Sequence, residues 1–300
     1  MNILITGGTG YIGGKLIRRL SEEGHRIYAV VRKTSHTENI EPYVEGLIDV
    51  GHLDAFYEQV RESHPQVLIQ LMGFYTAVHD PHSLRELMND NIVDAMTVVD
   101  AAVAAGVKRI IATASVQQQR DGKEPLPINA YGASRNAFER MLCDFGHLYD
   151  LSVTVLTLFD TYGADDQRRK VFNLVRRLKE HESIDMSAGE QKMYLLYIDD
   201  VVEGYLCALH QSVLKNCFEK FALRAKEPIR LRDFVERYLE LSGKEVVIHW
   251  GARPYMALEI MDPTGFGEVL PGWGAKVSYE EGLALCAQAD RSLENIEKAQ

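Results

Sequence analysis

A glycine-rich segment near the start of the chain has the residue types and the spacing needed to hold a pyrophosphate. It lies between an apolar segment and a segment of helical periodicity, and it reads Thr6-Gly7-Gly8-Thr9-Gly10-Tyr11-Ile12-Gly13. Gly7 allows a tight turn, Gly10 lets backbone amides approach the phosphates, and Gly13 lets the helix pack closely on the strand. The helix N-terminus then faces the anion. The segment predicts a dinucleotide site that includes Thr9, Tyr11 and Ile12.

The end of the second predicted strand indicates which dinucleotide to expect. Folds that select NAD(H) usually carry Asp or Glu there, about 20 residues after the loop, to accept hydrogen bonds from the adenosine ribose. This chain carries Arg32 and Lys33, whose cationic groups suit the 2′-phosphate of NADP(H). NADP(H) is therefore the predicted cofactor, and NAD(H) is the alternative if both side chains are merely solvated. The predicted cofactor site also includes Asp49 and Leu71. Asp49 is a candidate acceptor for the adenine amino group, or else an exposed loop residue.

The elements that must position this loop alternate between strand and helix over the first half of the chain. The expected strands are almost wholly apolar, which is typical of parallel strands covered on both faces. This pattern predicts an α/β fold with a Rossmann-type, doubly wound parallel sheet. Strands are expected at Asn2–Thr6, His25–Val31, Gln66–Leu71, Val107–Thr113 and Val153–Phe159, and helices at Tyr11–Glu23, Leu53–Glu62, Leu84–Ala105 and Ala133–Tyr149.

The alternation loosens after Asp160. Helices are expected at Lys170–Glu180 and Asp200–His210, a strand is expected at Tyr194–Ile198, and glycine and proline then become frequent. We expect a dinucleotide-binding domain over residues 1–160. A smaller C-terminal lobe over residues 161–300 is expected to be mainly substrate-binding, with some segments returning to the Rossmann sheet.

A second group of residues could carry acid–base chemistry. Tyr131 and Arg135 are four positions apart, which places both on one face of a helix. Thr113 ends a predicted strand. These residues belong to a set of short motifs spread along the chain, which consists of the Thr6–Gly13 loop, Asn91, Thr113, Tyr131-Gly132-Ala133-Ser134-Arg135, Leu158-Phe159-Asp160-Thr161-Tyr162-Gly163 and Tyr197-Ile198-Asp199-Asp200.

With these motifs the sequence resembles the extended short-chain dehydrogenase/reductase family, of the NAD-dependent epimerase/dehydratase type, over nearly its whole length. The resemblance implies that Tyr131 exchanges a proton with a sugar oxygen while hydride moves between the nicotinamide and the carbon bearing that oxygen. It implies that Thr113 hydrogen-bonds the same oxygen and that Arg135 holds the nicotinamide ribose.

Two positions depart from the family pattern. The family carries lysine where Arg135 stands. A guanidinium can still stabilise a phenolate, but it is effectively never deprotonated, so a proton relay through this position is lost. Gln117 and Gln118 replace a frequent Tyr-Gly pair, which alters the expected wall of the pocket.

The residues beside Thr113 narrow the reaction that the resemblance implies. Family dehydratases follow their threonine with an Asp-Glu pair, whereas Ala114 and Ser115 follow it here, so the acid and base of a dehydration are missing. The sequence is most similar to nucleotide-sugar 4-ketoreductases, the branch that contains CDP-abequose synthase. We therefore predict NADPH-dependent reduction of a nucleotide-activated 4-keto-6-deoxy sugar. The alternatives are a nucleotide-sugar 4-epimerase with bound NAD and a catalytically weak dinucleotide-binding regulator.

Four residues are predicted to contact the nucleotide-sugar substrate. Thr113 and Ser115 are expected near the sugar, and Arg168 and Lys170 near its phosphates, where a basic cluster has a chemical reason to exist. The basic run Arg168-Arg169-Lys170 can also be interpreted as a solvated helix start. Met193 stands where family members often carry an arginine aimed at the substrate pyrophosphate.

The composition argues against several other classes of protein. The chain has 300 residues, a formal net charge of -10 and a pI near 5.5, which argues against a nucleic-acid partner. No apolar run approaches about 18 residues, so no membrane partner is expected. The histidines and the cysteines Cys143, Cys207, Cys217 and Cys286 lack metal-ligand spacing, so we predict no metal site, and free thiols fit a cytoplasmic protein. The family resemblance also implies a homodimer, which we expect to form through the helices Leu84–Ala105 and Ala133–Tyr149.

Overall fold

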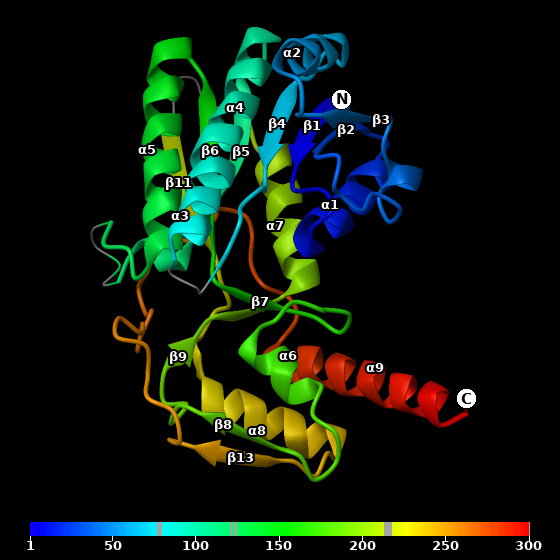
Figure 1. The fold of residues 1–300 in the computed structure, drawn as a ribbon, viewed down its shortest axis with the longest axis vertical. Helices are drawn as coiled ribbons and strands as arrows, with labels where there is room; N and C mark the ends of the chain where they lie inside the picture. Colours follow the sequence, from blue (N-terminus) through cyan, green and yellow to red (C-terminus); the bar gives the residue numbers. More distant parts are fainter. Residues whose placement is uncertain (77–79, 121, 123–124, 213–217, 300) are drawn as a thin grey trace. The chain divides into compact units, whose positions relative to one another are not determined.

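A computed structural model of the protein describes residues 1–76, 80–120, 122, 125–212 and 218–299 (Figure 1). The chain divides into two units. Unit 1 comprises Met1–Leu158, Val202–Leu223 and Gly267–Trp273, and unit 2 comprises Phe159–Val201, Arg224–Phe266 and Gly274–Gln300.

Unit 1 is built on a seven-stranded parallel sheet with the strand order β3-β2-β1-β4-β5-β6-β11. The chain winds outward from β1 in one direction and from β4 in the other, so the predicted Rossmann-type, doubly wound sheet is confirmed. The strands are β1 Asn2–Thr6, β2 Arg26–Val31, β3 Gly46–Asp49, β4 Val67–Gln70, β5 Arg109–Ser115, β6 Ser152–Leu158 and β11 Phe218–Leu223.

Helices cover both faces of this sheet, which explains why its central strands are largely apolar. Helices α2, α4 and α5 pack side by side on one face (Figure 1), and α1 is joined to α7 by an ion pair of 3.0 Å between Arg19 and Glu203. The helices are α1 Tyr11–Glu22, α2 Leu53–Glu62, α3 Pro81–Met88, α4 Ala95–Ala104, α5 Ala130–Tyr149 and α7 Ile198–His210, with short turns η1 Glu41–Tyr43 and η3 Val116–Gln118.

Three predicted helices differ from the structure: the one expected at Lys170–Glu180 is shorter, Val171–Arg176, and the one expected at Ala133–Tyr149 begins at Ala130. The third is interrupted. The segment expected as Leu84–Ala105 begins at Pro81, where the Asp80 side chain caps it by accepting from the amides of His82 and Ser83. A π-helical segment, η2 Asn89–Asp94, then separates α3 from α4. Such π-bulges occur frequently at functional sites, and this one carries Asn91.

Unit 2 contains three two-stranded sheets and an aromatic core. Tyr162, Phe172, Phe234 and Tyr238 pack edge to face, with ring centroids 4.8–6.0 Å apart. No helix in the described residues is long and apolar enough to cross a membrane. The elements are β7 Asp160–Tyr162, α6 Val171–Arg176, β8 Ser183–Met186, β9 Lys192–Met193, β10 Leu195–Tyr197, β12 Ile229–Arg230, α8 Leu231–Ser242, β13 Val247–Trp250 and α9 Tyr279–Ala299.

Candidate functional site

The glycine loop connects β1 to α1, and two of its glycines have no room for a side chain. Gly7 has a φ of +66°, and a Cβ on it would lie 2.9 Å from the amide nitrogen of Met72. A Cβ on Gly13 would lie 2.2 Å from the Gly7 carbonyl oxygen. These approaches bring α1 against the end of β1, as a phosphate-binding turn requires.

The N-terminus of α1 has no side-chain cap. Gly10 is its N-cap residue, and the first helical hydrogen bond runs 2.9 Å from the Gly14 amide to the Gly10 carbonyl. The helix itself therefore does not use the amides that precede Gly14. Thr9, Tyr11 and Ile12 are half-buried around this turn. The residues present fit a dinucleotide pyrophosphate.

Thr6 joins the carboxyl ends of β1 and β4 beside the loop. Its buried hydroxyl donates to Gln70 Oε1 at 2.7 Å and accepts from the amides of Leu71 and Met72 at 3.1 Å each. Leu71 is thereby held directly beside Gly7, at the edge of the sheet where cofactors bind in this class of fold.

The predicted selectivity residues lie at the ends of the neighbouring strands. Arg32 is exposed and its guanidinium donates to Asp90 in η2 at 2.7 Å. Lys33 is exposed, and Asp49 accepts from the Gly51 amide at 3.0 Å. The sequence analysis missed Asp90 because it lies 58 positions from Arg32, and no local pattern signals the pair.

Arg135 fixes the ends of two strands. It is 2% exposed, and its guanidinium donates to the carbonyl of Met72 at 3.0 Å and to the carbonyl of Thr113. Its charge also lies 5.1 Å from the centre of the Phe138 ring. Arg135 thus connects α5 to the residues that follow β4 and to β5 itself.

Asn91 adds a second connection between the loop after β4 and α5. Its side chain is fully buried, accepts from the Phe74 amide at 2.7 Å, and donates to the Phe74 carbonyl at 3.0 Å and to Ser134 Oγ at 2.9 Å. The π-helical segment η2 therefore orients the first turns of α5, which carries Tyr131 and Arg135.

The candidate catalytic side chains gather around a residue that the sequence analysis missed. The phenol oxygen of Tyr205, in α7, lies 2.7 Å from Thr113 Oγ1. Burial raises the pKa of Tyr205 well above its usual range; the hydrogen bond with Thr113 and the charge of Arg135 act in the opposite direction, and Tyr131 adds to the rise. Tyr131 itself packs edge to face on Tyr75, with ring centroids 5.2 Å apart. Thr113 and Arg135 are thus in contact at the end of β5, and Tyr131 lies one turn before Arg135 on α5; contact of Tyr131 with Thr113 stays a prediction.

Ser115 caps the short helix η3. Its hydroxyl accepts from the Gln117 amide at 3.2 Å, and its own amide donates to Gln118 Oε1 at 2.7 Å. Gln118 is 1% exposed and also donates to Asn136 and Glu139 of α5 at 2.9 and 2.7 Å. This network accounts for Gln118 at a position that departs from the family pattern. Contact between Ser115 and a sugar stays a prediction.

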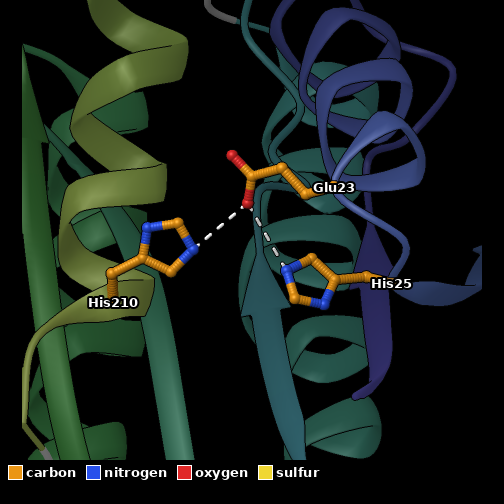
Figure 2. A group of neighbouring side chains, drawn as sticks. All are labelled: Glu23, His25 and His210. Atoms are coloured by element: carbon orange, nitrogen blue, oxygen red, sulfur yellow. Dashed lines mark ion pairs between the residues drawn. The ribbon is translucent and has the colours of Figure 1, made fainter.

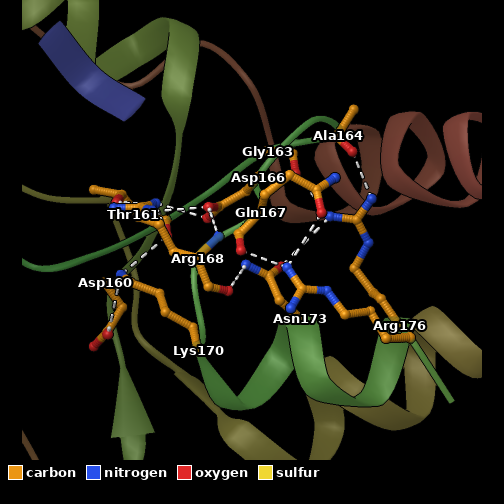
Figure 3. A network of polar contacts seen from close by, with 11 residues as sticks. Asp160, Thr161, Gly163, Ala164, Asp166, Gln167, Arg168, Lys170, Asn173 and Arg176 are labelled. Carbon is orange, nitrogen blue, oxygen red and sulfur yellow. Dashed lines mark hydrogen bonds and ion pairs between the residues drawn. The ribbon is translucent and has the colours of Figure 1, made fainter. Parts of the chain in front are cut away.

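The basic cluster of unit 2 is internally bonded (Figure 3). Arg168 donates to both carboxylate oxygens of Asp166 at 2.7 and 2.8 Å and to the Thr161 hydroxyl at 2.9 Å. Lys170 donates to the Thr161 carbonyl at 3.2 Å and lies 3.9 Å from Asp160. The structure therefore brings Arg168 and Lys170 together around Thr161, and their contact with phosphate stays a prediction.

One cluster of imidazole and carboxylate groups lies at the opposite ends of the strands from the glycine loop. Glu23 Oε2 is 3.1 Å from His210 Nε2 and 3.5 Å from His25 Nε2 (Figure 2). The other ring nitrogen of His25 faces the Met1 ammonium at 3.4 Å. Burial lowers the pKa of His25, and that ammonium lowers it further. Glu23 and His25 lie in the turn between α1 and β2, and His210 ends α7. One ligand atom from each residue lies within 4.8 Å of the others, so the absence of a metal site stays a prediction.

The predicted free thiols are only partly buried in the described residues. Cys286 is buried, and Cys143 and Cys207 are half-buried. Cys217 lies outside the described residues.

The fold and the glycine loop define a Rossmann-type protein with a candidate dinucleotide site. The chain matches the profile of the NAD dependent epimerase/dehydratase family over residues 3–221, and it belongs to that family. The resemblance drawn from the motifs is thereby confirmed.

Named relatives within this family differ in their reactions. CDP-abequose synthase of Yersinia pseudotuberculosis is 27% identical over 69% of this chain and 72% of its own length. The structure of UDP-glucose 4-epimerase from Thermotoga maritima is similar with a TM-score of 0.80 and 23% identity, over 98% of this chain and 100% of that one. The structure of the Thermus thermophilus UDP-glucose 4-epimerase in complex with NAD is similar with a TM-score of 0.79 and 20% identity, over 97% of this chain and 99% of that one.

Proposed function

We propose that the protein is a nicotinamide-dependent, nucleotide-sugar-modifying enzyme, and specifically an NADPH-dependent reductase of a nucleotide-activated 4-keto-6-deoxy sugar. The observation that carries this proposal is the hydrogen bond from Arg135 to the Thr113 carbonyl at the end of β5, with Tyr131 one turn before Arg135 on the same helix. The similarity to CDP-abequose synthase supports reduction, as do Arg32 and Lys33 at the end of β2; the lack of an acid–base pair after Thr113 argues against dehydration.

Each of the three residues has a distinct role in this reaction. The Tyr131 phenol donates a proton to the carbonyl oxygen and is left as a phenolate, which solvent later reprotonates. The Thr113 hydroxyl donates a hydrogen bond to the same oxygen and stabilises the negative charge that develops there. A bound nicotinamide dinucleotide supplies the hydride. Arg135 holds the Thr113 carbonyl, and we retain it as the candidate anchor of the nicotinamide ribose.

The proposed preference for NADP(H) depends on Arg32 and Lys33, because no carboxylate stands at the end of β2 to accept from a bare ribose. Replacing both by alanine is expected to weaken binding of NADPH more than binding of NADH. Equal losses for the two cofactors would contradict the assignment, and fluorescence titration of the reduced cofactors measures both.

The reaction is tested by following NADPH absorbance with CDP-, UDP-, dTDP- and GDP-linked 4-keto-6-deoxy sugars. Wild-type protein is expected to oxidise NADPH with at least one of them, and Tyr131→Phe is expected to lose most of this turnover. Tyr149→Phe is the matched control, because Tyr149 ends the same helix and is exposed. Undiminished turnover in Tyr131→Phe would overturn the assignment.

A nucleotide-sugar 4-epimerase with bound NAD is the second candidate. Two observations favour it: the ion pair between Arg32 and Asp90 engages one of the two proposed phosphate ligands, and similar solved structures include 4-epimerases, one in complex with NAD. Mass spectrometry of the purified protein distinguishes the candidates. Bound NAD, together with interconversion of C4 epimers and no consumption of NADPH, would replace reduction by epimerisation.

We also propose that two chains form a homodimer through α3, η2 and α5. Large apolar side chains on these elements are exposed, and they include Leu84, Met88, Val93 and Met141. Analytical ultracentrifugation of Val93→Lys and Met141→Lys, with wild type beside them, tests the assignment. A wild-type monomer would contradict it.

A further inference from the structure

Tyr205 is fully buried, and it contacts the hydroxyl of the proposed carbonyl-binding residue. Its relative exposure is 0%, and its phenol oxygen lies 2.7 Å from Thr113 Oγ1. Thr113 itself is half-buried. The pair therefore connects a sealed phenol in α7 to a more accessible hydroxyl in β5.

The burial of Tyr205 determines which oxygen donates. Among the described residues, Thr113 Oγ1 is the only hydrogen-bond partner recorded for the phenol. A buried O–H group without an acceptor is unfavourable, so the phenol proton points to Thr113. The Thr113 oxygen then accepts from Tyr205, and its own proton remains available to another acceptor.

The position of Tyr205 is fixed by close packing of α7 on the sheet. A Cβ on the preceding residue, Gly204, would lie 2.5 Å from the Leu223 side chain of β11. One turn further along α7, Arg109 at the start of β5 donates to the Ala208 carbonyl at 2.6 Å. Strand β5 and helix α7 are thus bonded at both ends of their contact, which leaves the phenol little freedom to turn away from Thr113.

We propose that Tyr205 is a positioning residue that orients the Thr113 hydroxyl as a hydrogen-bond donor toward the substrate carbonyl oxygen. The proposal rests on the proposed function, in which Thr113 binds that oxygen. Its physical basis is a donor chain from Tyr205 to Thr113 to the substrate, in which each hydroxyl accepts from one side and donates to the other. Such chains strengthen the terminal hydrogen bond, because each bond polarises the next.

Tyr205 does not act as a second acid in this arrangement. Burial raises the pKa of its phenol well above the usual range, so the group remains protonated and retains its donor. Its proton is directed to Thr113, whereas the proton lost to the substrate comes from Tyr131.

The test compares Tyr205→Phe, Thr113→Val and the double variant. Tyr205→Phe is expected to lower kcat about tenfold, the order of effect for one oriented hydrogen bond, with KM and the affinity for NADPH unchanged. In the Thr113→Val background, the same change is expected to have no further effect on kcat, because the two residues act as one unit. Tyr57→Phe is the control: it removes another hydrogen-bonded phenol of unit 1, 2.6 Å from Asp100 in α4, and should leave kcat unchanged.

The outcomes separate this role from the proposed function. Turnover by wild type with an unchanged kcat in Tyr205→Phe would overturn the positioning role alone, as would additive losses in the double variant. Absence of turnover by wild type, with keto sugars and with 4-hydroxy sugars alike, would overturn the proposed function and this role with it. A lowered kcat that disappears in the Thr113→Val background supports the role.

Discussion

Replacing Gly13 by alanine is expected to disrupt dinucleotide binding without removing any polar group. The added Cβ would lie 2.2 Å from the Gly7 carbonyl oxygen and 2.8 Å from the Gly8 Cα. Both contacts are with backbone, so no side chain can rotate away, and the oxygen and the Cβ must separate by about 1 Å to reach even a tight contact. The Gly7 carbonyl accepts from the Gly10 amide at 3.0 Å. Displacing it therefore distorts the turn that faces the phosphates.

The magnitude of this effect follows from the cost of overpacking. Inserting a methyl group into a packed site costs about 1–3 kcal/mol. If that cost is released by deforming the binding turn, the Kd for NADPH rises by about 5- to 150-fold. Fluorescence titration with NADPH measures the Kd. Thermal unfolding of the free protein measures how much of the overpacking cost appears as lost stability and not as weaker binding.

The adjacent glycine provides the matched control. A Cβ on Gly14 would have its nearest contact 3.5 Å away, at the Asn39 side chain, which is ordinary packing. Gly14→Ala is therefore expected to bind NADPH as wild type does and to gain up to about 1 kcal/mol from helix propensity. Equal affinities for the two variants and wild type, with equal stabilities, would refute the assignment of the phosphate turn to Gly7, Gly10 and Gly13.

Two further substitutions and one labelling experiment test charges and a thiol elsewhere in the molecule. Arg135→Lys should destabilise the fold by about 1–3 kcal/mol, because a single ammonium cannot reach both carbonyls that the guanidinium joins. A free energy of unfolding in urea equal to that of wild type would contradict this structural role of Arg135. Since the pKa of His25 is lowered in the folded state, stability should fall as the pH drops below the unfolded value of about 6.5. His25→Gln should reduce this loss of stability between pH 7.5 and the folded pKa. An unchanged dependence of the free energy of unfolding on pH would contradict the role of His25. Burial raises the pKa of Cys286 to about 12, so thiol reagents should label Cys286 only at the rate of unfolding, whereas labelling as fast as at Cys143 would contradict its burial.

The strands and helices around the glycine loop could be predicted because their signals are local. β1 was predicted at its exact bounds and α1 within one residue, because continuous apolar runs and a glycine turn identify a buried strand followed by a helix. Strand β3 was missed because it has only four residues and lies at the sheet edge. Strand β11 was missed because its Glu219 and Lys220 interrupt the apolar pattern, as is usual for the exposed face of an edge strand.

Helix α8 shows a failure of a different kind. Its buried residues Leu231, Phe234, Val235 and Tyr238 follow the spacing i, i+3, i+4 and i+7, and Gly243 ends the helix in the left-handed conformation. These signals are present in the sequence and typical of an amphipathic helix. The frequent glycine and proline further along the chain obscured them. The helix was therefore predictable from the sequence, in contrast to β3.

The residues of the candidate site also differ in whether a local sequence pattern signals them. Gly7, Gly10 and Gly13 act through their own backbone geometry, so their spacing was sufficient to predict the turn. Asp90 and Tyr205 act through partners 58 and 92 positions away. Such contacts depend on strand order and on how the helices cover the sheet, and neither is written in a local pattern. Sequence motifs thus identified the residues expected to meet the ligands, together with Asn91 and Arg135, but not Asp90 or Tyr205.

The contacts of Arg135 and Tyr205 suggest a structural reason for arginine at position 135, where the family carries lysine. The guanidinium binds the carbonyl of Thr113, and the phenol binds its hydroxyl, so one residue is fixed through both its backbone and its side chain. A lysine in place of Arg135 could not donate to the Met72 and Thr113 carbonyls with the same planar geometry. The arginine is therefore integrated into the support of Thr113, which argues against random loss of the lysine. If Thr113 binds the substrate oxygen as proposed, Arg135 and Tyr205 act on the same hydrogen bond, and their substitution should be non-additive in kcat.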